Sequence, residues 1–418
     1  MGDPKNSHVT LSHSEYIDLL SAKAARRQCQ KIYAETLAGR GLFKIDSTQI
    51  DPTVDRVVNS TKRRYPSLEI PFHSRWGHFR AGGIDRVREL QTKWVSSPGN
   101  EVSQRFFELV IVSVLLDAGA GTSWSYQPSQ GSAIGRSEGL ALASLEAYLA
   151  GTFSHSATQP NRVDHEGLNA LTVAILEKRF QVNAQNPLIG LEGRVSLLKK
   201  LAKVLETTQT LRLGDFFDIW AVKAAANSGV NAAANAKPNS SKSISASKLL
   251  HEVLIHLGPI WPSRLVCDHG PLGDAWRSEL LNGETVVFHK LSQWLTYSLL
   301  EPYLWAGFEI CDLDELTGLP EYRNGGLFLD TKVLLPKDEN AFSLEYEAGS
   351  EFVIQWRALT VCLLDEVGMR VKERLQRPQL SLANILEGGT WWAGREIAKE
   401  LRADGSPPLK LKLDGTVF

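Results

Sequence analysis

Apolar residues recur every three to four positions along most of the chain, which is the spacing of one face of an α-helix. The first such segment follows Ser12, whose spacing from Glu15 fits a capping box, and it runs to about Leu37. The same spacing predicts further helices at residues 84–95, 138–149, 167–180, 190–205, 248–257, 286–300, 352–372 and about 382–401.

A few stretches depart from this spacing. Residues 41–75 contain short β-branched pieces such as residues 54–58, and prolines interrupt them, so we expect extended or irregular backbone there. Residues 308–335 and 407–418 also look extended. The apolar run at residues 106–117 fits either a buried helix or a buried strand. The predicted fold class is therefore mainly α with a minority of short strands.

Residues 225–246 are low in complexity and rich in Ala, Asn and Ser. Such a composition buries too little apolar surface to offset the entropy lost on ordering, so we interpret it as a flexible linker or an insertion. The chain then divides into an N-terminal helical part, residues 1–224, and a C-terminal part, residues 247–418. We expect the second part to complete the same site as the first, in one cavity.

Composition narrows the class of protein. The 418 residues are 43% hydrophobic and 22% charged, which suffices for a large core and excludes disorder over the whole chain. Lys and Arg number 46 and Asp and Glu 47, a net charge of −1, so no basic excess points to nucleic acid as a partner. The longest apolar run is about 11 residues, too short to cross a membrane.

Four cysteines are widely spaced and form no CxxC pair, which argues against a disulfide framework and fits a reducing compartment. The first residues show no basic region followed by an apolar stretch, the pattern of a secretory signal. We therefore expect a cytoplasmic protein.

Several segments outside residues 225–246 form a distinctive set. They are residues 79–85 (FRAGGID), 115–121 (LLDAGAG), 136–140 (RSEGL), 186–193 (NPLIGLEG), 258–262 (GPIWP), 271–276 (PLGDAW), 288–300 (FHKLSQWLTYSLL), 316–326 (LTGLPEYRNGG), 386–391 (LEGGTW) and 414–418 (DGTVF). Taken together, this set resembles the fungal and bacterial uracil-catabolism family that is often described only as a domain of unknown function. The resemblance runs from about residue 70 to the C-terminus.

This resemblance implies a pathway more than a reaction. In that pathway the uracil ring, carried on a ribose phosphate, is opened, and a later step must part urea from the ribose phosphate. The expected ligand is a pyrimidine-derived ribose phosphate, and other uracil-catabolism enzymes are expected partners. A further similarity, to helix-rich N-glycosylase folds, suggests cleavage of an N-glycosidic bond.

Asp117 stands between an apolar run and a pair of glycines. A buried carboxylate without a partner is costly, so this residue either ends a helix or faces a cavity. Both interpretations stay open. The second makes Asp117 a candidate catalytic carboxylate that faces a sugar.

On a helix at residues 288–300, His289, Gln293 and Thr296 share one face beside a broad apolar face. A narrow polar stripe of this kind lines a cavity, faces solvent, or holds a histidine within the core. In the first case His289 and Gln293 bind the substrate and orient the leaving group.

Residues 321–326 are predicted to form a loop that offers a carboxylate (Glu321), a guanidinium (Arg323) and an amide (Asn324). Arginine suits phosphate recognition, and paired glycines let backbone approach a ligand. Asp330 follows an apolar stretch that we interpret as a strand, with its side chain towards either core or pocket. Glu321 and Asp330 join Asp117 as catalytic candidates, and Arg323 and Asn324 as substrate-binding candidates. A polar turn before an edge strand is the alternative.

Eleven tryptophans are numerous for this length, and most of them belong in a core. Trp124, next to the glycines that follow Asp117, is the candidate for stacking on a planar ligand such as urea or a base.

Metal ligation is a secondary hypothesis, because no zinc-binding spacing is present. No cofactor is required for glycosidic hydrolysis, but one zinc ion bound by His289, Asp330 and Glu321 would support hydrolysis of the ureido C–N bond instead. Cys267 and His269 offer a further thiolate and imidazole. The leading hypothesis is thus an N-glycosidase-like hydrolase, against a metal-dependent hydrolase or a noncatalytic binding protein.

Overall fold

The structure is a computed structural model, and it describes residues 7–117, 120–121, 123–225, 242–261 and 265–412. Within these residues the fold is mainly α with short strands, which confirms the predicted class. The chain divides into two compact units, each assembled from segments far apart in the sequence. Unit 1 comprises residues 1–73, 262–294 and 312–418, and unit 2 comprises residues 74–261 and 295–311.

The predicted linker or insertion at residues 225–246 lies between two parts of unit 2. Residues 226–241 of this segment lie outside the described residues. The predicted division into parts 1–224 and 247–418, and the single cavity completed by both, stay predictions.

Among the residues that the structure describes, unit 1 holds nine short strands and the longest helix, α15. Its α-helices are α1 (His13–Leu19), α2 (Ala22–Leu37), α3 (Ile50–Arg64), α14 (Tyr322–Asp330), α15 (Glu351–Leu375), α16 (Leu382–Ile385) and α17 (Trp391–Leu401). Its shorter helical turns are η1 (Ser47–Gln49), η5 (Leu313–Glu315) and η6 (Leu386–Thr390). Its strands are β1 (Ser7–His8), β2 (Phe43–Ile45), β6 (Leu265–Cys267), β7 (Gly270–Pro271), β8 (Ala275–Ser278), β9 (Glu284–Val287), β11 (Leu334–Pro336), β12 (Glu345–Glu347) and β13 (Lys410–Lys412).

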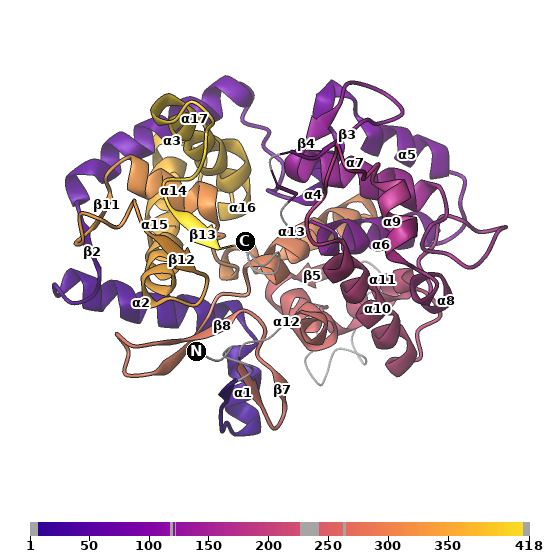
Figure 1. Ribbon diagram of the computed structural model, residues 1–418, viewed down its shortest axis with the longest axis horizontal. Coiled ribbons are helices and arrows are strands. Elements are labelled where there is room, and N and C mark those ends of the chain that lie inside the picture. Colours follow the sequence, from indigo (N-terminus) through magenta and orange to yellow (C-terminus); the bar gives the residue numbers. More distant parts are fainter. Residues whose placement is uncertain (1–6, 118–119, 122, 226–241, 262–264, 413–418) are drawn as a thin grey trace. The chain divides into compact units, whose positions relative to one another are not determined.

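The core of unit 1 is built around α15, which packs against α2, α3, α14 and α16 (Figure 1). Most of its side chains from Phe352 to Val371 are buried, as expected of a helix with neighbours on several sides. The strands pair locally as β1-β6-β7, β2-β11, β8-β9 and β12-β13, so they join helices rather than form a central sheet.

Unit 2 is also helical. Its helices are α4 (Arg75–Phe79), α5 (Arg86–Trp94), α6 (Glu101–Leu115), α7 (Arg136–Leu149), α8 (His165–Asn169), α9 (Val173–Arg179), α10 (Leu191–Thr207), α11 (Phe216–Lys223) and α12 (Ala246–Leu257), with the turns η2 (Ala81–Gly83), η3 (Leu213–Asp215) and η4 (Gly258–Ile260). Its strands are β3 (Ser125–Tyr126), β4 (Ile134–Gly135), β5 (Ser243–Ser245) and β10 (Glu309–Cys311), paired as β3-β4 and β5-β10. The division between the units falls inside α13 (Lys290–Trp305), after Trp294.

The core of unit 2 is built around α6, which packs against α4, α7, α10 and α11 (Figure 1). Its residues from Phe106 to Leu115 are all buried, so the apolar run that fitted helix or strand is a helix that is apolar all round. Glu108 and Ser113 are the polar residues of this run, and the Glu108 carboxylate accepts from Arg212, Tyr148 and the Gly214 amide.

The prediction of extended backbone at residues 54–58 is wrong, because these residues lie within α3. Ile50, Val54, Val57, Val58 and Thr61 form one buried face at helical spacing. The β-branched residues lower helix propensity by only a few tenths of a kcal/mol each, and the burial of this face outweighs that cost.

The prediction of a loop at residues 321–326, and of a strand ending at Asp330, is also wrong, because residues 322–330 form α14. Glu321 caps this helix, and Gly325 lies so close to α15 that a Cβ there would come within 2.6 Å of the Trp356 ring. The glycines therefore serve close helix packing, and long-range contact overrides their low helix propensity.

Candidate functional site

Asp117 follows Leu116, the C-cap residue of α6 in unit 2, and its carboxylate has two partners. Arg75 Nη1 lies 2.9 Å from Oδ1, and Ser137 Oγ lies 2.7 Å from both carboxylate oxygens. The Asp117 side chain is 11% exposed, whereas that of Arg75 is fully buried. The carboxylate is thus held in one orientation but is not closed off.

Arg75 binds more than the carboxylate. Its Nε donates to Ser113 Oγ at 2.7 Å, and Nη1 also reaches the Ser137 carbonyl oxygen at 3.1 Å. His78 Nδ1 lies 3.1 Å from the same Nη1 and 3.2 Å from Ser137 Oγ. Burial lowers the pKa of Arg75, and the charge of Asp117 opposes that shift. We call Arg75, His78, Asp117 and Ser137 the Asp117 cluster.

The sequence suggests Ser137 as the cap of a helix that begins at Glu138, and the structure differs. Helix α7 begins at Arg136 with Gly135 as its cap residue, which leaves the Ser137 hydroxyl to bind Asp117. A Cβ at Gly139 would lie 2.2 Å from the Ile134 carbonyl oxygen, so this glycine permits the close approach of α7 to β4.

A second arginine stands near Asp117. Arg194, in α10, donates from Nε to the Leu116 carbonyl oxygen at 3.0 Å. Burial lowers its pKa to about 10, and Asp117 opposes that shift. Four elements of unit 2 therefore bring a carboxylate, two guanidinium groups, an imidazole and a hydroxyl to the end of α6.

Trp124, the predicted stacking residue, also lies in unit 2 but is only 2% exposed. Its Nε1 donates to the Phe180 carbonyl oxygen at 3.0 Å, and its ring lies nearly parallel to Tyr126 and Phe180. This is the environment of a core tryptophan, and its predicted contact with a ligand stays a prediction.

Both carboxylate oxygens of Glu321, in unit 1, accept hydrogen bonds from backbone amides at the start of α14. Oε1 accepts from the Asn324 amide and Oε2 from the Arg323 amide, each at 2.7 Å. A side chain that satisfies two amides at a helix start is a cap worth about 1 kcal/mol. This use leaves Glu321 a weaker candidate for catalysis than Asp117.

Asp330, at the opposite end of α14, forms a two-bond ion pair with Arg402, which follows α17. The distances are 2.8 Å and 2.6 Å, and the Asp330 side chain is 5% exposed. The catalytic interpretation of Asp330 required a carboxylate without a neutralising partner. Arg402 is such a partner, as Arg75 is for Asp117, and the pair ties α14 to α17. The catalytic role of Asp330 stays a prediction, and its two-bond pair makes it a weaker candidate than Asp117.

His289 and Gln293 both take part in bonds inside unit 1. The His289 Nε2 donates to the Leu19 carbonyl oxygen at 2.7 Å, and burial lowers the pKa of this imidazole. Gln293 and Thr317 bind each other twice, from Gln293 Nε2 to Thr317 Oγ1 and from the Thr317 amide to Gln293 Oε1, each at 2.8 Å. Helix α13 begins at Lys290, and His289 before it has a positive φ of 50°, so the prediction that His289 shares a helix face with Gln293 is wrong. Gln293 joins α13 to the segment that contains Thr317.

Arg323 and Asn324 are buried at the start of α14. Arg323 Nη1 donates to the Gly405 carbonyl oxygen at 3.0 Å, and Asn324 Nδ2 donates to the Leu319 carbonyl oxygen at 3.1 Å. Arg323 Nε and Asn324 Oδ1 are buried without a partner in the described part of the chain. Both residues stay candidates for substrate binding.

Sequence reasoning missed Asp274, a carboxylate of unit 1 whose pKa is strongly lowered. Asp274 forms a two-bond ion pair with Arg357 at 2.8 Å and 2.7 Å, and it also accepts from Trp276 Nε1 at 2.8 Å. Burial would raise the pKa of Asp274, but Arg357 and the hydrogen bonds outweigh it and lower the pKa to about 2. Asp274 and Trp276 lie in the segment PLGDAW, but a partner 83 residues away has no signal in that segment.

The described residues contain no group of three His, Cys, Asp or Glu side chains placed to hold a metal ion. Glu321 and Asp330 lie at opposite ends of α14, and His289 Nε2 is bound to Leu19. Cys267 Sγ lies 3.5 Å from the Gly270 carbonyl oxygen.

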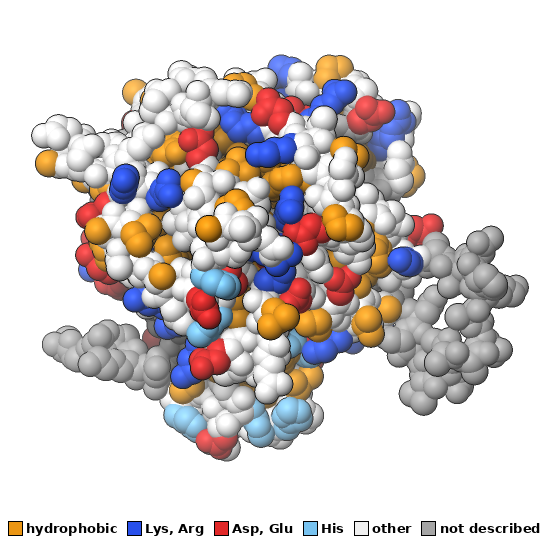
Figure 2. Space-filling model, turned by 90° about the vertical axis from the view of Figure 1, so that its right-hand side faces the viewer, with side chains coloured by type: hydrophobic (Ala, Val, Ile, Leu, Met, Phe, Trp, Pro, Cys, Tyr) orange, Lys and Arg blue, Asp and Glu red, His pale blue; other side chains and the backbone are white. Residues whose placement is uncertain are grey.

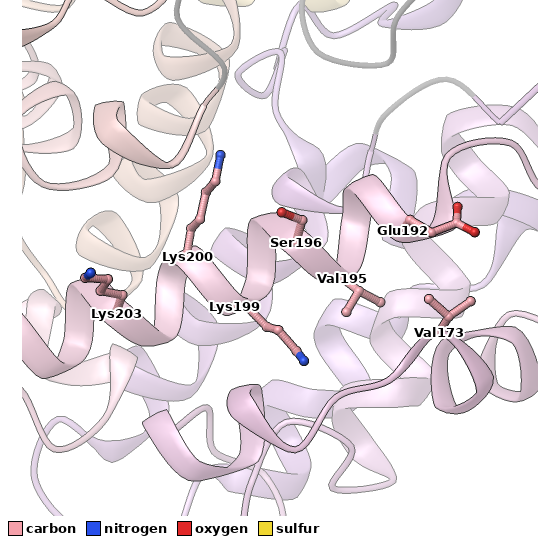
Figure 3. Close-up of a pocket in the computed structure, with 7 residues that line it drawn as sticks. All are labelled: Val173, Glu192, Val195, Ser196, Lys199, Lys200 and Lys203. Carbon is pink, nitrogen blue, oxygen red and sulfur yellow. The ribbon is translucent and has the colours of Figure 1, made fainter.

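A hollow of about 390 Å³ lies on unit 2 along α10, lined by Val173, Glu192, Val195, Ser196, Lys199, Lys200 and Lys203. Figure 3 shows Lys199 and Lys200 pointing in different directions from α10. Lys200 also donates to the Ile260 carbonyl oxygen at 3.3 Å. Ligand sites need polar groups that converge, so this hollow is a weaker candidate than the Asp117 cluster.

On the face drawn in Figure 2, Lys and Arg side chains are interspersed with Asp and Glu rather than gathered into one area. This mixture agrees with the near balance of 46 basic and 47 acidic residues in the sequence. Among the described helices, none is long and apolar enough to cross a bilayer.

The structure therefore brings together only some of the predicted residues. Glu321, Arg323 and Asn324 adjoin at the start of α14, with Gln293 elsewhere in the same unit. Asp117 and Trp124 lie in unit 2. The sequence analysis did not identify the partners of Asp117. Ser137 lies in the segment RSEGL, which carries part of the resemblance, whereas Arg75 and His78 precede the segment FRAGGID.

The chain matches a family described as "Protein of unknown function (DUF1688)" over residues 18–418. It is 40% identical to "Protein urg3" of Schizosaccharomyces pombe over 421 aligned residues, which cover 96% of this chain and 98% of that protein. It is 35% identical to "Uracil catabolism protein 4" of Lachancea kluyveri over 426 aligned residues, which cover 92% of this chain and 94% of that protein.

Proposed function

Because the chain belongs to the DUF1688 family, and a relative over nearly its whole length is named for uracil catabolism, we propose that it acts in uracil catabolism. The finer part of the proposal is the reaction: hydrolysis of the N-glycosidic bond of a ribosyl urea phosphate or a related nucleoside phosphate. Opening of a pyrimidine ring on a ribose phosphate leaves a ureido group on the sugar. The bond between the ureido nitrogen and the sugar carbon must then be cut to release urea.

One observation supports this reaction most directly, the environment of Asp117. Departure of the leaving nitrogen develops positive charge on the sugar, and a fixed carboxylate beside the sugar stabilises that charge. Among the three predicted carboxylates, Asp117 alone combines residual exposure with a side chain that neither caps a helix nor forms a two-bond ion pair. We assign it the role of the charge-stabilising carboxylate.

The other members of the Asp117 cluster then have positioning roles. Arg75 and Ser137 hold the carboxylate in one orientation, so little reorganisation is needed when the sugar becomes charged. His78 lies within hydrogen-bond reach of Ser137 and is half-buried. Its place supports a role in holding a hydroxyl of the sugar or a water.

The test is turnover of enzymatically made ribosyl urea phosphate, with separate assays for urea and ammonia. Asp117→Asn keeps the size of the side chain and removes its charge, and we expect kcat to fall ~10²–10³-fold. KM should change much less, because the sugar carries no positive charge in the ground state. Glu177→Gln changes an exposed carboxylate in the same unit and should leave turnover unchanged.

Normal turnover of the Asp117→Asn variant would remove Asp117 from the mechanism. Release of ammonia instead of urea would contradict the glycosidic reaction and favour hydrolysis of the ureido C–N bond. Binding of the compound without turnover would favour a binding protein.

A further inference from the structure

Arg136, in unit 2, is directly joined to the Asp117 cluster, and the proposed mechanism does not use it. It is the first residue of α7 and precedes Ser137, whose hydroxyl binds Asp117. The Cα atoms of neighbouring residues are ~3.8 Å apart, so the backbone of Arg136 lies beside this cluster. Arg136 also begins the segment RSEGL, which carries part of the family resemblance.

The backbone of Arg136 has a φ of 57°, in the left-handed region that residues other than glycine rarely adopt. This conformation arises because β4 ends at Gly135 and α7 begins at the next residue, with no connecting loop. A glycine would adopt it with less strain. The chain has an arginine there instead, and strained residues of this kind are concentrated at active sites and ligand clamps.

The Arg136 side chain is exposed, and no described residue hydrogen-bonds to its guanidinium or pairs with it. The two other arginines near Asp117 differ in this respect. Arg75 is fully buried against Asp117, and Arg194 is buried and donates to the Leu116 carbonyl oxygen. Of these three guanidinium groups, that of Arg136 is therefore the one that can bind a ligand from solvent.

The charge of the proposed substrate calls for such a group. The phosphate of a ribosyl urea phosphate is negatively charged, and so are Asp117 and Glu138, whose charges both act on Arg75. A sugar phosphate bound beside Asp117 therefore needs a further cation to offset the repulsion. Arginine suits this role, because its planar guanidinium binds phosphate through two parallel hydrogen bonds.

We propose that Arg136 binds the phosphate of the substrate, and that the protein thereby selects a ribosyl urea phosphate over the unphosphorylated compound. The proposal rests on the proposed function, because that function places the sugar beside Asp117. It adds a specificity-determining residue to the Asp117 cluster, and every group that it invokes belongs to unit 2.

Binding of ribose 5-phosphate, measured by isothermal titration calorimetry, tests the contact without turnover. We expect the wild type to bind ribose 5-phosphate more tightly than ribose. Arg136→Gln should weaken the binding of ribose 5-phosphate ~10–100-fold, the range for loss of hydrogen bonds to a charged group. Added salt should weaken binding by the wild type more than binding by this variant.

Arg88→Gln is the matched control. Arg88, on α5 in the same unit, is also exposed and pairs with no described residue, so its loss should leave both affinities unchanged. Failure of the wild type to distinguish ribose 5-phosphate from ribose would overturn the proposal. Equal binding of ribose 5-phosphate by Arg136→Gln and the wild type would overturn it as well.

Kinetics with two substrates test the selection. On ribosyl urea phosphate we expect Arg136→Gln to lower kcat/KM ~10–100-fold, whereas on ribosyl urea without phosphate the variant and the wild type should be equal. Arg136→Lys keeps the charge but not the paired hydrogen bonds, so its kcat/KM on the phosphorylated compound should fall between the two. A loss by the same factor on both compounds would show a structural role and contradict the proposal.

The strained backbone gives an independent measurement. Arg136→Gly relieves the strain of the positive φ, so we expect a higher melting temperature together with weaker binding of ribose 5-phosphate. Lys332→Gly is the control, because Lys332 is exposed and has a φ of 61°, and it should raise the melting temperature without changing binding. A more stable Arg136→Gly protein with unchanged binding would overturn the phosphate contact.

The failures are distinguishable. If the wild type binds ribose 5-phosphate through Arg136 but does not hydrolyse ribosyl urea phosphate, the proposed function fails and the phosphate contact stands. If the wild type hydrolyses ribosyl urea phosphate and Arg136→Gln does so equally well, the proposal for Arg136 is overturned and the proposed function stands.

Discussion

The ion pair between Asp330 and Arg402 gives a prediction that separates a structural carboxylate from a catalytic one. Asp330→Asn keeps the shape of the side chain and removes the charge that holds Arg402 at 2.8 Å and 2.6 Å. We expect this variant to lose stability while its kcat on a confirmed substrate stays within a few-fold of wild type.

The magnitude follows from burial. An exposed ion pair contributes ~0.2–1 kcal/mol, whereas hydrogen bonds to charged groups contribute ~1.5–3 kcal/mol when partly buried. The Asp330 side chain is 5% exposed and that of Arg402 is 25% exposed, and an asparagine can still accept one bond. We therefore expect a loss of about 1.5–3 kcal/mol in the free energy of unfolding.

Urea unfolding followed by circular dichroism measures this loss. The matched control is Glu400→Gln on α17, which breaks the exposed pair with Arg56, and we expect it to cost less than about 1 kcal/mol. Arg402→Gln, alone and combined with Asp330→Asn, closes a double-mutant cycle that isolates the interaction. Unchanged stability together with a ~10²–10³-fold fall in kcat would refute this account and restore Asp330 as a catalytic carboxylate.

Two further predictions concern packing and acid stability. Gly389→Ala should destabilise the protein by ~1–3 kcal/mol because its Cβ meets α3, whereas Gly193→Ala, with no atom within 4 Å of its Cβ, should be neutral or stabilising in thermal melting. Equal melting temperatures for the two variants would contradict the close contact of η6 with α3. The pKa of Asp274 is about 2 in the folded state and ~3.9 in an unfolded chain, so its contribution to stability is present above ~pH 4 and is lost as pH falls through the folded value. Asp274→Asn should lower stability at neutral pH and flatten the dependence of the urea midpoint on pH between ~4 and ~2. If the variant's midpoint depended on pH as steeply as that of wild type, the pKa of Asp274 would not be lowered in the folded state.

The spacing of apolar residues predicted the helices well where it continues without interruption along one helix face. The apolar face from residue 12 to residue 37 belongs to two helices, α1 and α2, which are separated by Leu20 and Ser21. Ser12 and Glu15 form the predicted capping box. Helices α10 and α12 likewise follow their apolar spacing. In these segments the residues that set the helix lie within the helix.

Long-range contacts decided the rest. Helix α14 holds a Gly-Gly pair that reads as a turn, and it forms because Glu321 caps it and Trp356 of α15 covers Gly325. Asp330 looked unpaired from its neighbours in sequence, and its partner Arg402 lies 72 residues further on. No spacing within residues 321–330 contains that information.

The candidate sites show the same limit. Asp117 could be found from the sequence, because a carboxylate between an apolar run and glycines is unusual, but its partners Arg75 and Ser137 lie 42 and 20 positions away.

The central claim is the bond that is cut, and one nuclear magnetic resonance experiment addresses it. Ribosyl urea phosphate labelled with ¹³C at the ureido carbon and at the sugar C1 is incubated with the purified protein, and both carbons are followed in time. The account predicts that free urea and the C1 resonances of ribose phosphate appear together, in equal amounts and at equal rates. Conversion of the ureido carbon to bicarbonate while C1 stays bonded to nitrogen would contradict it.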